Sequence, residues 1–309
     1  MSVFEGRAWI SNQGLVDVSI EVEEGYISSV KKINLNPNRE KVDGLILPAA
    51  MDMHVHFRDP GYTHKEDWKT GSESAACGGV TAVVDMPNTN PFTSDYSQFK
   101  EKERIAKEKS VVDFGIGINV EENLTEQDWF ETVPAAFWKL YPYGVSSKDY
   151  FRLAQEVLDK TKKPLVVHCE HPDYMHNNPL EKLSDHTENR LIAEEKCLSE
   201  MPPSKYLHVA HLSTSNGLRN LPSQSSTEVC PHHLLLNLDN CSSLDCKVDP
   251  PLRTISDNKT LYEAYRKGTI PILASDHAPH TIEEKKSSAP PSGMPGVETM
   301  VPLMLQEVV

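Results

Sequence analysis

The sequence predicts an α/β fold: a (β/α)8 TIM barrel of eight parallel strands and their connecting helices, behind a small N-terminal β-module. Three observations support this. From Leu45 onward, apolar runs rich in β-branched residues alternate with amphipathic segments, as expected for buried parallel strands joined by helices. Eight such runs occur, the number that closes a barrel. The stretch 45–309 is close in length to the roughly 250 residues typical of this fold.

The first predicted domain is the β-module, residues 1–45. It holds three short alternating stretches separated by glycine-containing turns, at Ala8–Ser11, Val16–Val22 and Tyr26–Lys31. A small antiparallel sheet of this size is too short to hold a core alone, so we expect it to pack against something else. Residues 46–309 form the second predicted domain, the barrel.

The barrel elements follow in order along the chain. Strands are predicted at Leu45–His56, Thr81–Met86, Val111–Ile118, Ala135–Tyr141, Pro164–His168, Tyr206–Leu212, Thr227–Leu235 and Thr269–Ser275. Helices are predicted at Tyr96–Lys109, Lys148–Lys162, Glu188–Met201 and Lys259–Lys267. The main alternative is an open doubly wound sheet. It is disfavoured because no glycine-rich phosphate-binding turn follows the first strand.

Composition excludes several classes of function. The formal net charge of −14 repels a polyphosphate backbone, so nucleic-acid binding is not expected. No apolar run approaches the roughly 20 residues that span a bilayer, and the N-terminus lacks the features of a secretory signal. The six cysteines are too sparse for a disulfide framework. Several lie in apolar runs, which indicates buried thiols and a cytoplasmic location.

The ends of the predicted strands carry polar side chains, and the C-terminal strand ends of such a barrel hold its chemistry. His54 and His56 are two residues apart on the first strand, so both face the same side and can chelate one divalent metal. His-x-His alone is a weak signal, because two chance histidines on a half-buried strand would look the same. His168, His211 and Asp276 end three later strands. Buried polar groups need partners, so this ring of donors favours a metal site.

Lys139 lies between aromatic residues at the end of the fourth predicted strand. A buried lysine is unfavourable unless it is paired or modified. One interpretation is a side chain that reaches solvent. The other is an amine that reacts with carbon dioxide to form a carbamate, an anionic ligand able to bridge two metals.

Eight segments of the chain together resemble the dihydroorotases of the amidohydrolase superfamily. They are Asp52–Gly61, Asp85–Thr89, Trp138–Tyr141, His211–Thr214, Pro231–Leu234, Pro250–Arg253, Ser275–Thr281 and Pro291–Thr299. Jointly they are specific, and they occur in the family's order along nearly the whole chain. Asp59-Pro60-Gly61 and the Asp-His-Ala-Pro-His-Thr block favour dihydroorotases over hydantoinases or allantoinases.

The resemblance implies a role for each matching residue. His54, His56 and Asp276 would bind one metal ion, most simply Zn²⁺. His168 and His211 would bind a second. Carboxylated Lys139 and a hydroxide would bridge the two ions. Arg58, Asn88 and His280 would hold the carboxylate of the substrate, and the planar fork of an arginine suits a carboxylate.

The implied reaction is the reversible hydrolysis of (S)-dihydroorotate to N-carbamoyl-L-aspartate, whose cyclisation leads to pyrimidines. Two metals share a bridging water and lower its pKa, which gives a nucleophile at neutral pH. Asp276 would accept its proton and pass it to the departing ring nitrogen. The expected partner is this small-molecule substrate. A homodimer or a complex with aspartate transcarbamoylase is also compatible with the resemblance.

Two features depart from the family pattern. Family members usually continue beyond the Gly293–Glu298 block, so we expect a chain truncated at Val309 with an incomplete β-module. The apolar residues after Val297, including Leu303 and Leu305, are expected to pack on the last strand or first helix. Asp249 stands where relatives often carry asparagine, and its charge is expected to weaken binding of an anionic substrate.

Two other functions stay open. One is a different cyclic-amide hydrolase, such as a hydantoinase, dihydropyrimidinase or allantoinase, which would not need the carboxylate-binding residues. The other is an inactive scaffold for aspartate transcarbamoylase, although such relatives lose ligands and every expected position is filled here.

Several further residues receive structural interpretations. His232 and His233 are expected to be structural or to support the metal ligands, and Cys169 to be a core thiol. Solvated positions are expected for His64, His171, His176 and His186. The segment Tyr141–Lys148 is either a mobile lid or an ordinary loop.

Overall fold

The computed structural model describes residues 1–32 and 38–307. The chain divides into two compact units, Met1–Ala50 and Met51–Val309. Val309, at which truncation is expected, lies outside the described residues.

The first unit is a four-stranded sheet in the order β3-β2-β1-β4. Its strands are β1 (Ser2–Ile10), β2 (Gly14–Glu23), β3 (Tyr26–Lys32) and β4 (Glu40–Ile46). The predicted antiparallel arrangement is confirmed for β1, β2 and β3, whereas β4 runs parallel to β1. Ala8, Val18 and Ile20 form the core of this unit.

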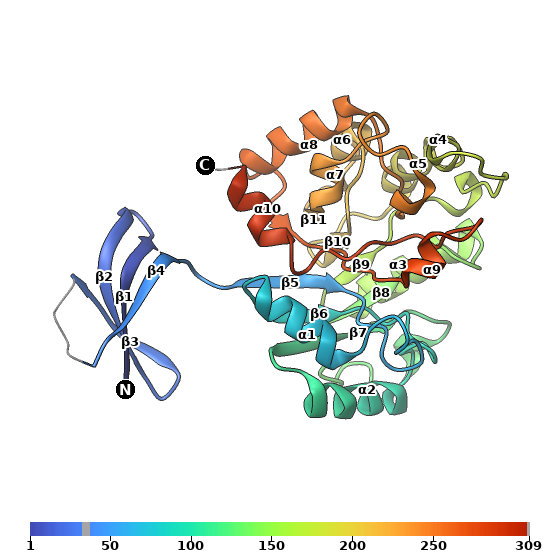
Figure 1. The fold of residues 1–309 in the computed structure, drawn as a ribbon. Coiled ribbons are helices and arrows are strands. Elements are labelled where there is room, and N and C mark those ends of the chain that lie inside the picture. The colour runs from blue at the N-terminus through green and yellow to red at the C-terminus, as the bar shows by residue number, and fades with distance from the viewer. Residues whose placement is uncertain (33–37, 308–309) are drawn as a thin grey trace. The chain divides into compact units, whose positions relative to one another are not determined.

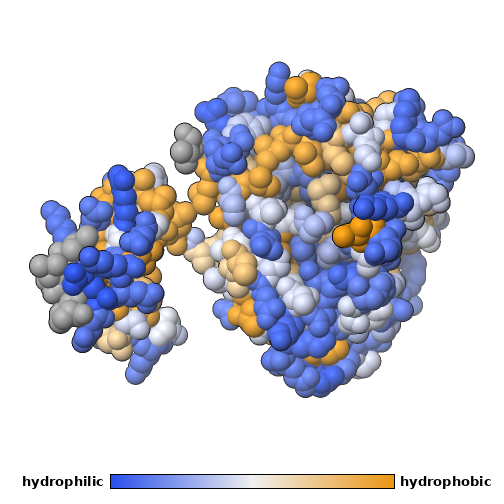
Figure 2. All heavy atoms as spheres, viewed as in Figure 1, coloured by the Kyte–Doolittle hydropathy of each residue, from blue (hydrophilic) through white to orange (hydrophobic). Residues whose placement is uncertain are grey.

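The same sheet also exposes apolar side chains. Trp9, Tyr26, Ile27 and Leu45 are each more than half exposed, and Figure 2 shows apolar residues on the surface of this unit. A four-stranded sheet with one small core buries little apolar surface. The sequence predicts a module too short to hold a core alone, but the module does hold this small one. Its expected packing against another part of the protein stays a prediction.

The second unit contains an eight-stranded sheet in the order β12-β11-β10-β9-β8-β7-β6-β5. The strands are β5 (Ala50–Val55), β6 (Val80–Asp85), β7 (Asp113–Asn119), β8 (Phe137–Leu140), β9 (Leu165–Val167), β10 (Leu207–Val209), β11 (Ser226–Val229) and β12 (Ile272–Leu273). A parallel bridge between Val55 and His277, with His56 N–H donating to His277 O at 2.7 Å, joins the first strand to the chain just after the last. The predicted barrel is therefore confirmed.

Helices surround these strands (Figure 1). They are α1 (Trp68–Cys77), α2 (Tyr96–Lys109), α3 (Ser147–Lys160), α4 (Leu183–Glu188), α5 (Ala193–Glu200), α6 (Ser215–Arg219), α7 (Pro231–Leu235), α8 (Ile255–Arg266), α9 (Ile282–Lys285) and α10 (Met300–Gln306), with short 3-10 turns η1 (Leu124–Glu126), η2 (Pro172–Tyr174) and η3 (Leu244–Cys246). Among the described residues, none of these helices has the length and apolar character needed to cross a membrane.

Prolines explain two errors in the predicted strands. The run Leu45–His56 divides into β4 and β5, because Pro48 lies between them and cannot donate a ladder hydrogen bond. The run Thr227–Leu235 is a strand only as far as Val229. Pro231 then begins α7, since proline suits the first turn of a helix.

The helical predictions also need correction at two places. The single helix expected at Glu188–Met201 is replaced by α4 and α5, with a turn at residues 189–192. The apolar stretch after Val297 does form a helix, α10, but Leu303 and Leu305 are 40% and 41% exposed, so their expected packing is wrong. Met300 is the buried residue of α10.

Candidate active site and metal centre

A cavity of about 280 Å³ opens at the C-terminal ends of the barrel strands. The predicted site residues that line it are His54, His56, Arg58, Asn88, Lys139, His168, His211 and Asp276. His280 is the exception, and it lies behind Arg58 rather than on the wall. Residues more than 200 positions apart in the sequence thus share one cavity, as the strand-end argument predicts.

Three of these side chains stand on unusual backbone. Arg58, His211 and Asp276 have positive φ angles of 61°, 38° and 48°, a region that non-glycine residues rarely occupy. Each comes a few residues after the end of a barrel strand. Such conformations persist where the surroundings impose them, and they cluster at functional sites.

The imidazoles of His54 and His56 converge on the carboxylate of Asp276. The Nε2 atoms of His54 and His56 lie 3.2 Å and 3.0 Å from Asp276 Oδ1. Burial would raise the pKa of Asp276, but the electrostatic attraction of the neighbouring His54 and His56 imidazoles outweighs it. The pKa is therefore well below its usual value. The carboxylate consequently stays ionised at neutral pH.

The other ring nitrogen of each histidine already has a partner. His56 Nδ1–H donates to Asn88 Oδ1 at 2.6 Å, and His54 Nδ1–H donates to Glu228 Oε1 at 2.5 Å. Burial lowers the pKa of His56 to about 4, so its ring carries one proton at neutral pH. With that proton on Nδ1, the Nε2 lone pair faces an anionic oxygen. A cation between them would satisfy both groups.

Among the described residues, Lys139 and His211, like the hydroxyl of Tyr141, leave a buried polar atom unpaired in the cavity wall. Within the described part of the chain, neither Lys139 Nζ nor His211 Nδ1 has a hydrogen-bond partner, and both residues are buried. Burial lowers the pKa of Lys139 to about 8. His54, His211 and Asp276 each offer a ligand atom within 4.8 Å of the others. Buried polar groups without partners are rare, so these residues fit a metal centre.

His168 lies beside His211, with ring centroids 4.5 Å apart. Its Nε2–H donates to Glu170 Oε2 at 2.7 Å, and Arg190 also binds that oxygen at 2.7 Å. A histidine held by a carboxylate through one nitrogen is a common arrangement for a metal ligand, because it fixes the tautomer and the ring orientation.

Of the predicted carboxylate-binding residues, Arg58 and Asn88 line the cavity and His280 contacts Arg58. Arg58 Nε–H donates to Pro279 O at 3.1 Å, and Arg58 Nη2 lies 3.2 Å from His280 Nε2. Lys65 Nζ donates to His280 Nδ1 at 3.1 Å. His280 therefore reaches the cavity through Arg58, and its expected direct contact with a ligand stays a prediction.

Comparison with known proteins places the chain in a family. Residues 45–300 match the model of the Amidohydrolase family. A dihydroorotase of Methanosphaera stadtmanae is 36% identical, over 94% of this chain and 74% of its own length. A dihydroorotase of Pyrococcus abyssi is 37% identical, over 97% and 73%. The chain belongs to the dihydroorotases of the amidohydrolase family. An L-hydantoinase structure from Arthrobacter aurescens has a TM-score of 0.83 at 23% identity, covering 98% of this chain and 76% of its own, which shows the shared fold.

Within this dihydroorotase fold, Glu228 is a site residue that the sequence analysis missed. It lies on β11, accepts a hydrogen bond from His54, and contacts His208 Nε2 at 3.1 Å through its other oxygen. The attractions of His54 and His208 outweigh burial and hold its pKa well below the usual value. An acidic residue inside an apolar strand is the signal that could have found it.

Asp249 lines the cavity but does not carry an isolated charge. His186 Nε2–H donates to Asp249 Oδ1 at 2.8 Å, Arg190 Nη1 lies 3.4 Å from the same oxygen, and Tyr143 donates to Oδ2 at 3.2 Å. His186 and His171 are both buried. Their expected solvated positions are therefore wrong. His64 and His176 are exposed as expected.

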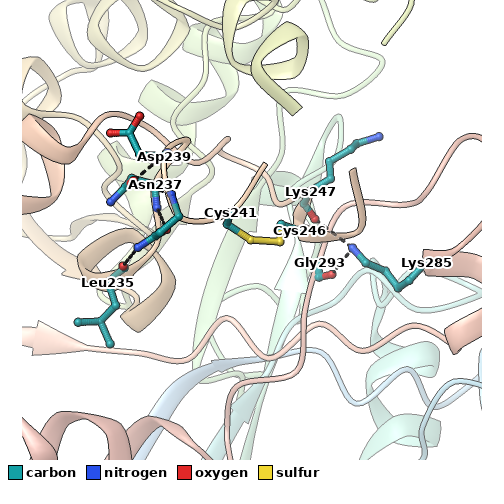
Figure 3. Close-up of a disulfide and its surroundings, with 9 residues drawn as sticks. Leu235, Asn237, Asp239, Cys241, Cys246, Lys247, Lys285 and Gly293 are labelled. Atoms are coloured by element: carbon teal, nitrogen blue, oxygen red, sulfur yellow. Dashed lines mark hydrogen bonds between the residues drawn. A yellow bond between two sulfur atoms is a disulfide. The ribbon is translucent and has the colours of Figure 1, made fainter. Parts of the chain in front are cut away.

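A disulfide lies just before Lys247, whose carbonyl accepts a hydrogen bond from Gly293 on the cavity wall. Cys241 and Cys246 are joined, which the expectation of thiols did not foresee (Figure 3). Lys285 Nζ donates hydrogen bonds to Lys247 O at 3.2 Å and to Gly293 O at 2.8 Å. Gly293 lines the cavity with φ of +126°, and a Cβ there would lie 2.6 Å from Ala278 O, so only glycine fits. Cys169, Cys197 and Cys230 are buried free thiols.

Proposed function

We propose that the chain catalyses the reversible hydrolysis of the ring amide of (S)-dihydroorotate to N-carbamoyl-L-aspartate. One observation supports this most directly. A single cavity joins a cluster of buried metal-ligand atoms, around Asp276, to the guanidinium of Arg58. A substrate with a ring amide at one end and a carboxylate at the other matches these two chemistries.

Divalent metal ions, most simply Zn²⁺, would be held by His54, His56, Lys139, His168, His211 and Asp276. When bound, such ions lower the pKa of a water molecule toward neutrality and polarise a carbonyl group. The mixture of imidazole and carboxylate donors suits zinc and related ions.

Lys139 is proposed to hold the metals as a carbamate. Its amine attacks the carbon of CO₂, a nitrogen–carbon bond forms, and a proton leaves the nitrogen to solvent. The product is an anion. The buried Nζ has no hydrogen-bond partner among the described residues, and conversion to a metal-binding anion would give this buried group partners.

Asp276 is proposed as the proton carrier. Its carboxylate lies between the two imidazoles and is ionised at neutral pH, so it can accept a proton from attacking water and deliver it to the leaving ring nitrogen. Arg58 and Asn88 are proposed to orient the substrate by its carboxylate, with His280 acting behind Arg58. Orientation of this kind lowers the entropic part of the barrier.

A cytoplasmic location is also proposed. The three buried free thiols support it, whereas the Cys241–Cys246 disulfide is a feature that opposes it. A homodimer or a complex with aspartate transcarbamoylase is proposed only from the family resemblance. An inactive scaffold is the second candidate function. It is disfavoured because the proposed ligand positions are occupied by suitable residues.

The test is an assay of ring opening and ring closure with purified chain, combined with metal analysis. We expect turnover of dihydroorotate, loss of turnover after chelation and its return on addition of Zn²⁺. Hydantoin, which has no carboxylate, serves as the comparison substrate. Turnover of hydantoin alone would indicate a hydantoinase, and no turnover with bound metal would indicate a scaffold.

A further inference from the structure

A second cluster of metal-binding side chains lies where β11 meets α7. Cys230, His232 and His233 are all buried, and each offers one ligand atom within 4.8 Å of the others. Among the described residues, those that line the cavity around Asp276 do not include these three. The reaction proposed above does not use them.

The tautomer of His233 is set by its surroundings. Its Nε2–H donates to Pro250 O at 3.0 Å, so in the neutral ring the other nitrogen, Nδ1, holds a lone pair. That Nδ1 has no partner among the described residues, although His233 is only 1% exposed. A histidine that donates one N–H to a backbone carbonyl and leaves the other nitrogen free has the arrangement of a metal ligand.

His232 gives an independent observation of the same kind. It is 6% exposed, and within the described chain its Nε2 has no hydrogen-bond partner. The rings of His232 and His233 lie 4.4 Å apart between centroids. Two adjacent buried histidines therefore each carry an unpaired nitrogen, although buried polar atoms are nearly always partnered.

The surroundings of the cluster are negative. Burial raises the pKa of the Cys230 thiol well above the usual value, and the carboxylates of Asp276, Glu228 and Asp52 add to this effect, whereas the charge of Lys139 opposes it. Burial lowers the pKa of His232 to about 4. Without an ion the cluster therefore consists of uncharged donors in a field that favours a cation.

We propose that Cys230, His232 and His233 bind one divalent metal ion, separate from the centre around Asp276. One sulfur and two imidazole nitrogens suit Zn²⁺. On binding, the S–H bond of Cys230 breaks, its proton leaves to solvent and a metal–sulfur bond forms. The three protein ligands leave one position of a tetrahedral ion for water.

The sulfur ligand gives a specific test. The ligands of the centre around Asp276 are nitrogen and oxygen atoms, so a thiolate-to-cobalt charge-transfer band reports only on a cysteine site. The full chain is stripped of metal and kept under anaerobic conditions without added reductant, so that the Cys241–Cys246 disulfide stays closed. It is titrated with Co²⁺, and its absorbance and bound metal are measured. We expect the band to appear, and Cys230→Ser to abolish it and bind one ion fewer per chain.

Two variants separate metal binding from folding. His233→Gln keeps an N–H for Pro250 O but removes Nδ1. Loss of a residue that only orients a metal ligand weakens metal binding by about 10- to 100-fold. His233→Gln should weaken cobalt binding at this site by more than that, because it removes a ligand. Cys169→Ser changes another buried thiol and should leave the band intact. A band that is absent, that persists in folded Cys230→Ser, or that disappears on mutation of the exposed Cys77 would overturn the proposal.

Because this readout does not depend on turnover, it stands apart from the proposed reaction. Loss of the band with normal hydrolysis of dihydroorotate would refute only the second site. A normal band without hydrolysis would refute only the proposed function.

Discussion

Two lysines in the barrel are fully buried, but their surroundings differ. Lys102 on α2 forms an ion pair with Asp85 and donates to Met86 O at 2.7 Å. Lys139 at the end of β8 has equally little exposed surface. In the described part of the chain its Nζ makes no hydrogen bond and faces the ring of Tyr141 at 5.2 Å.

The difference separates polar groups that complete the fold from those that await a ligand. A buried charge is tolerated when partners compensate it, as around Lys102, and is strongly unfavourable when they do not. His211, with its unpaired Nδ1, belongs with Lys139. The polar groups between α2 and β6 are thus paired within the protein, whereas the barrel mouth keeps polar atoms that are unpaired within the described chain and that the proposed metal ions would satisfy.

The largest expected effect comes from Lys139→Ala. This change removes the proposed bridging carbamate, so we expect kcat to fall by at least about 10³-fold, the scale of losing a group that stabilises charge in the transition state. Bound metal should fall with it. Activity and metal content of the purified variant measure both, and unchanged metal content with near-normal turnover would contradict the role.

Lys102→Met is the matched control for that experiment. It removes one partner of a buried ion pair, so we expect the free energy of unfolding to fall by about 3–5 kcal/mol. Asp85 holds Phe57 N–H through Oδ1 and Lys102 through Oδ2, so the bond to the backbone beside His56 can persist. The folded Lys102→Met variant should keep its metal. A loss of metal equal to that of Lys139→Ala would remove the distinction between the two lysines.

The next effect is that of Asp276→Asn. The amide has the same shape but cannot accept a proton from water, so we expect kcat to fall about 10²- to 10⁴-fold. Because the pKa of Asp276 is well below its usual value, the wild-type carboxylate is in its basic form throughout the neutral range. Single-turnover kinetics with metal-loaded protein test this, and turnover close to wild type would exclude Asp276 as the proton carrier.

A smaller effect is expected for Arg58→Met, which removes the guanidinium that lines the cavity. Charged hydrogen bonds contribute about 1.5–3 kcal/mol each, so KM for dihydroorotate should rise about 10- to 100-fold while kcat changes less. Lys65→Met is the comparison, since Lys65 contacts His280 and Glu284 but does not line the cavity. An equal rise in KM for the two variants would mean that Arg58 acts only through general charge.

Sequence patterns located the barrel and its mouth because strand ends of one sheet meet at one edge, wherever they lie in the chain. They could not show that Glu228 holds His54, because this contact joins residues 174 positions apart. The burial of His186 could not be predicted for the same reason, because its partner Asp249 belongs to a distant segment of the chain. The strand at Leu45–His56 was divided by Pro48, a local signal that the apolar pattern outweighed in the prediction.

The same local limits apply to the disulfide and to Lys139. The sequence places Cys241 and Cys246 five residues apart, and such spacing does not decide between thiols and a bond. For Lys139 the sequence left a solvent-reaching side chain as an alternative. Only the burial of Nζ excludes it, because burial depends on the packing of neighbouring strands.

The smallest effect on substrate binding is expected for Asp249→Asn, a cavity residue whose partners lie within the protein. The charge of Asp249 is compensated by Arg190 and by the hydrogen bond from His186, so KM should change by less than about threefold. Stability should change more, by about 1–2 kcal/mol, because Arg190 and His186 lose an anionic partner.

This loss has a defined pH dependence. Hydrogen bonding from His186 and the charge of Arg190 outweigh burial and hold the pKa of Asp249 well below its unfolded value. Its contribution to stability is therefore complete above about pH 4 and is lost as the pH falls further. The difference in thermal unfolding between wild type and Asp249→Asn should thus be constant from neutral pH down to about pH 4 and shrink in stronger acid. A difference that grows in acid would show that the carboxylate is uncompensated, and the expected weakening of substrate binding by its charge would then have a physical basis.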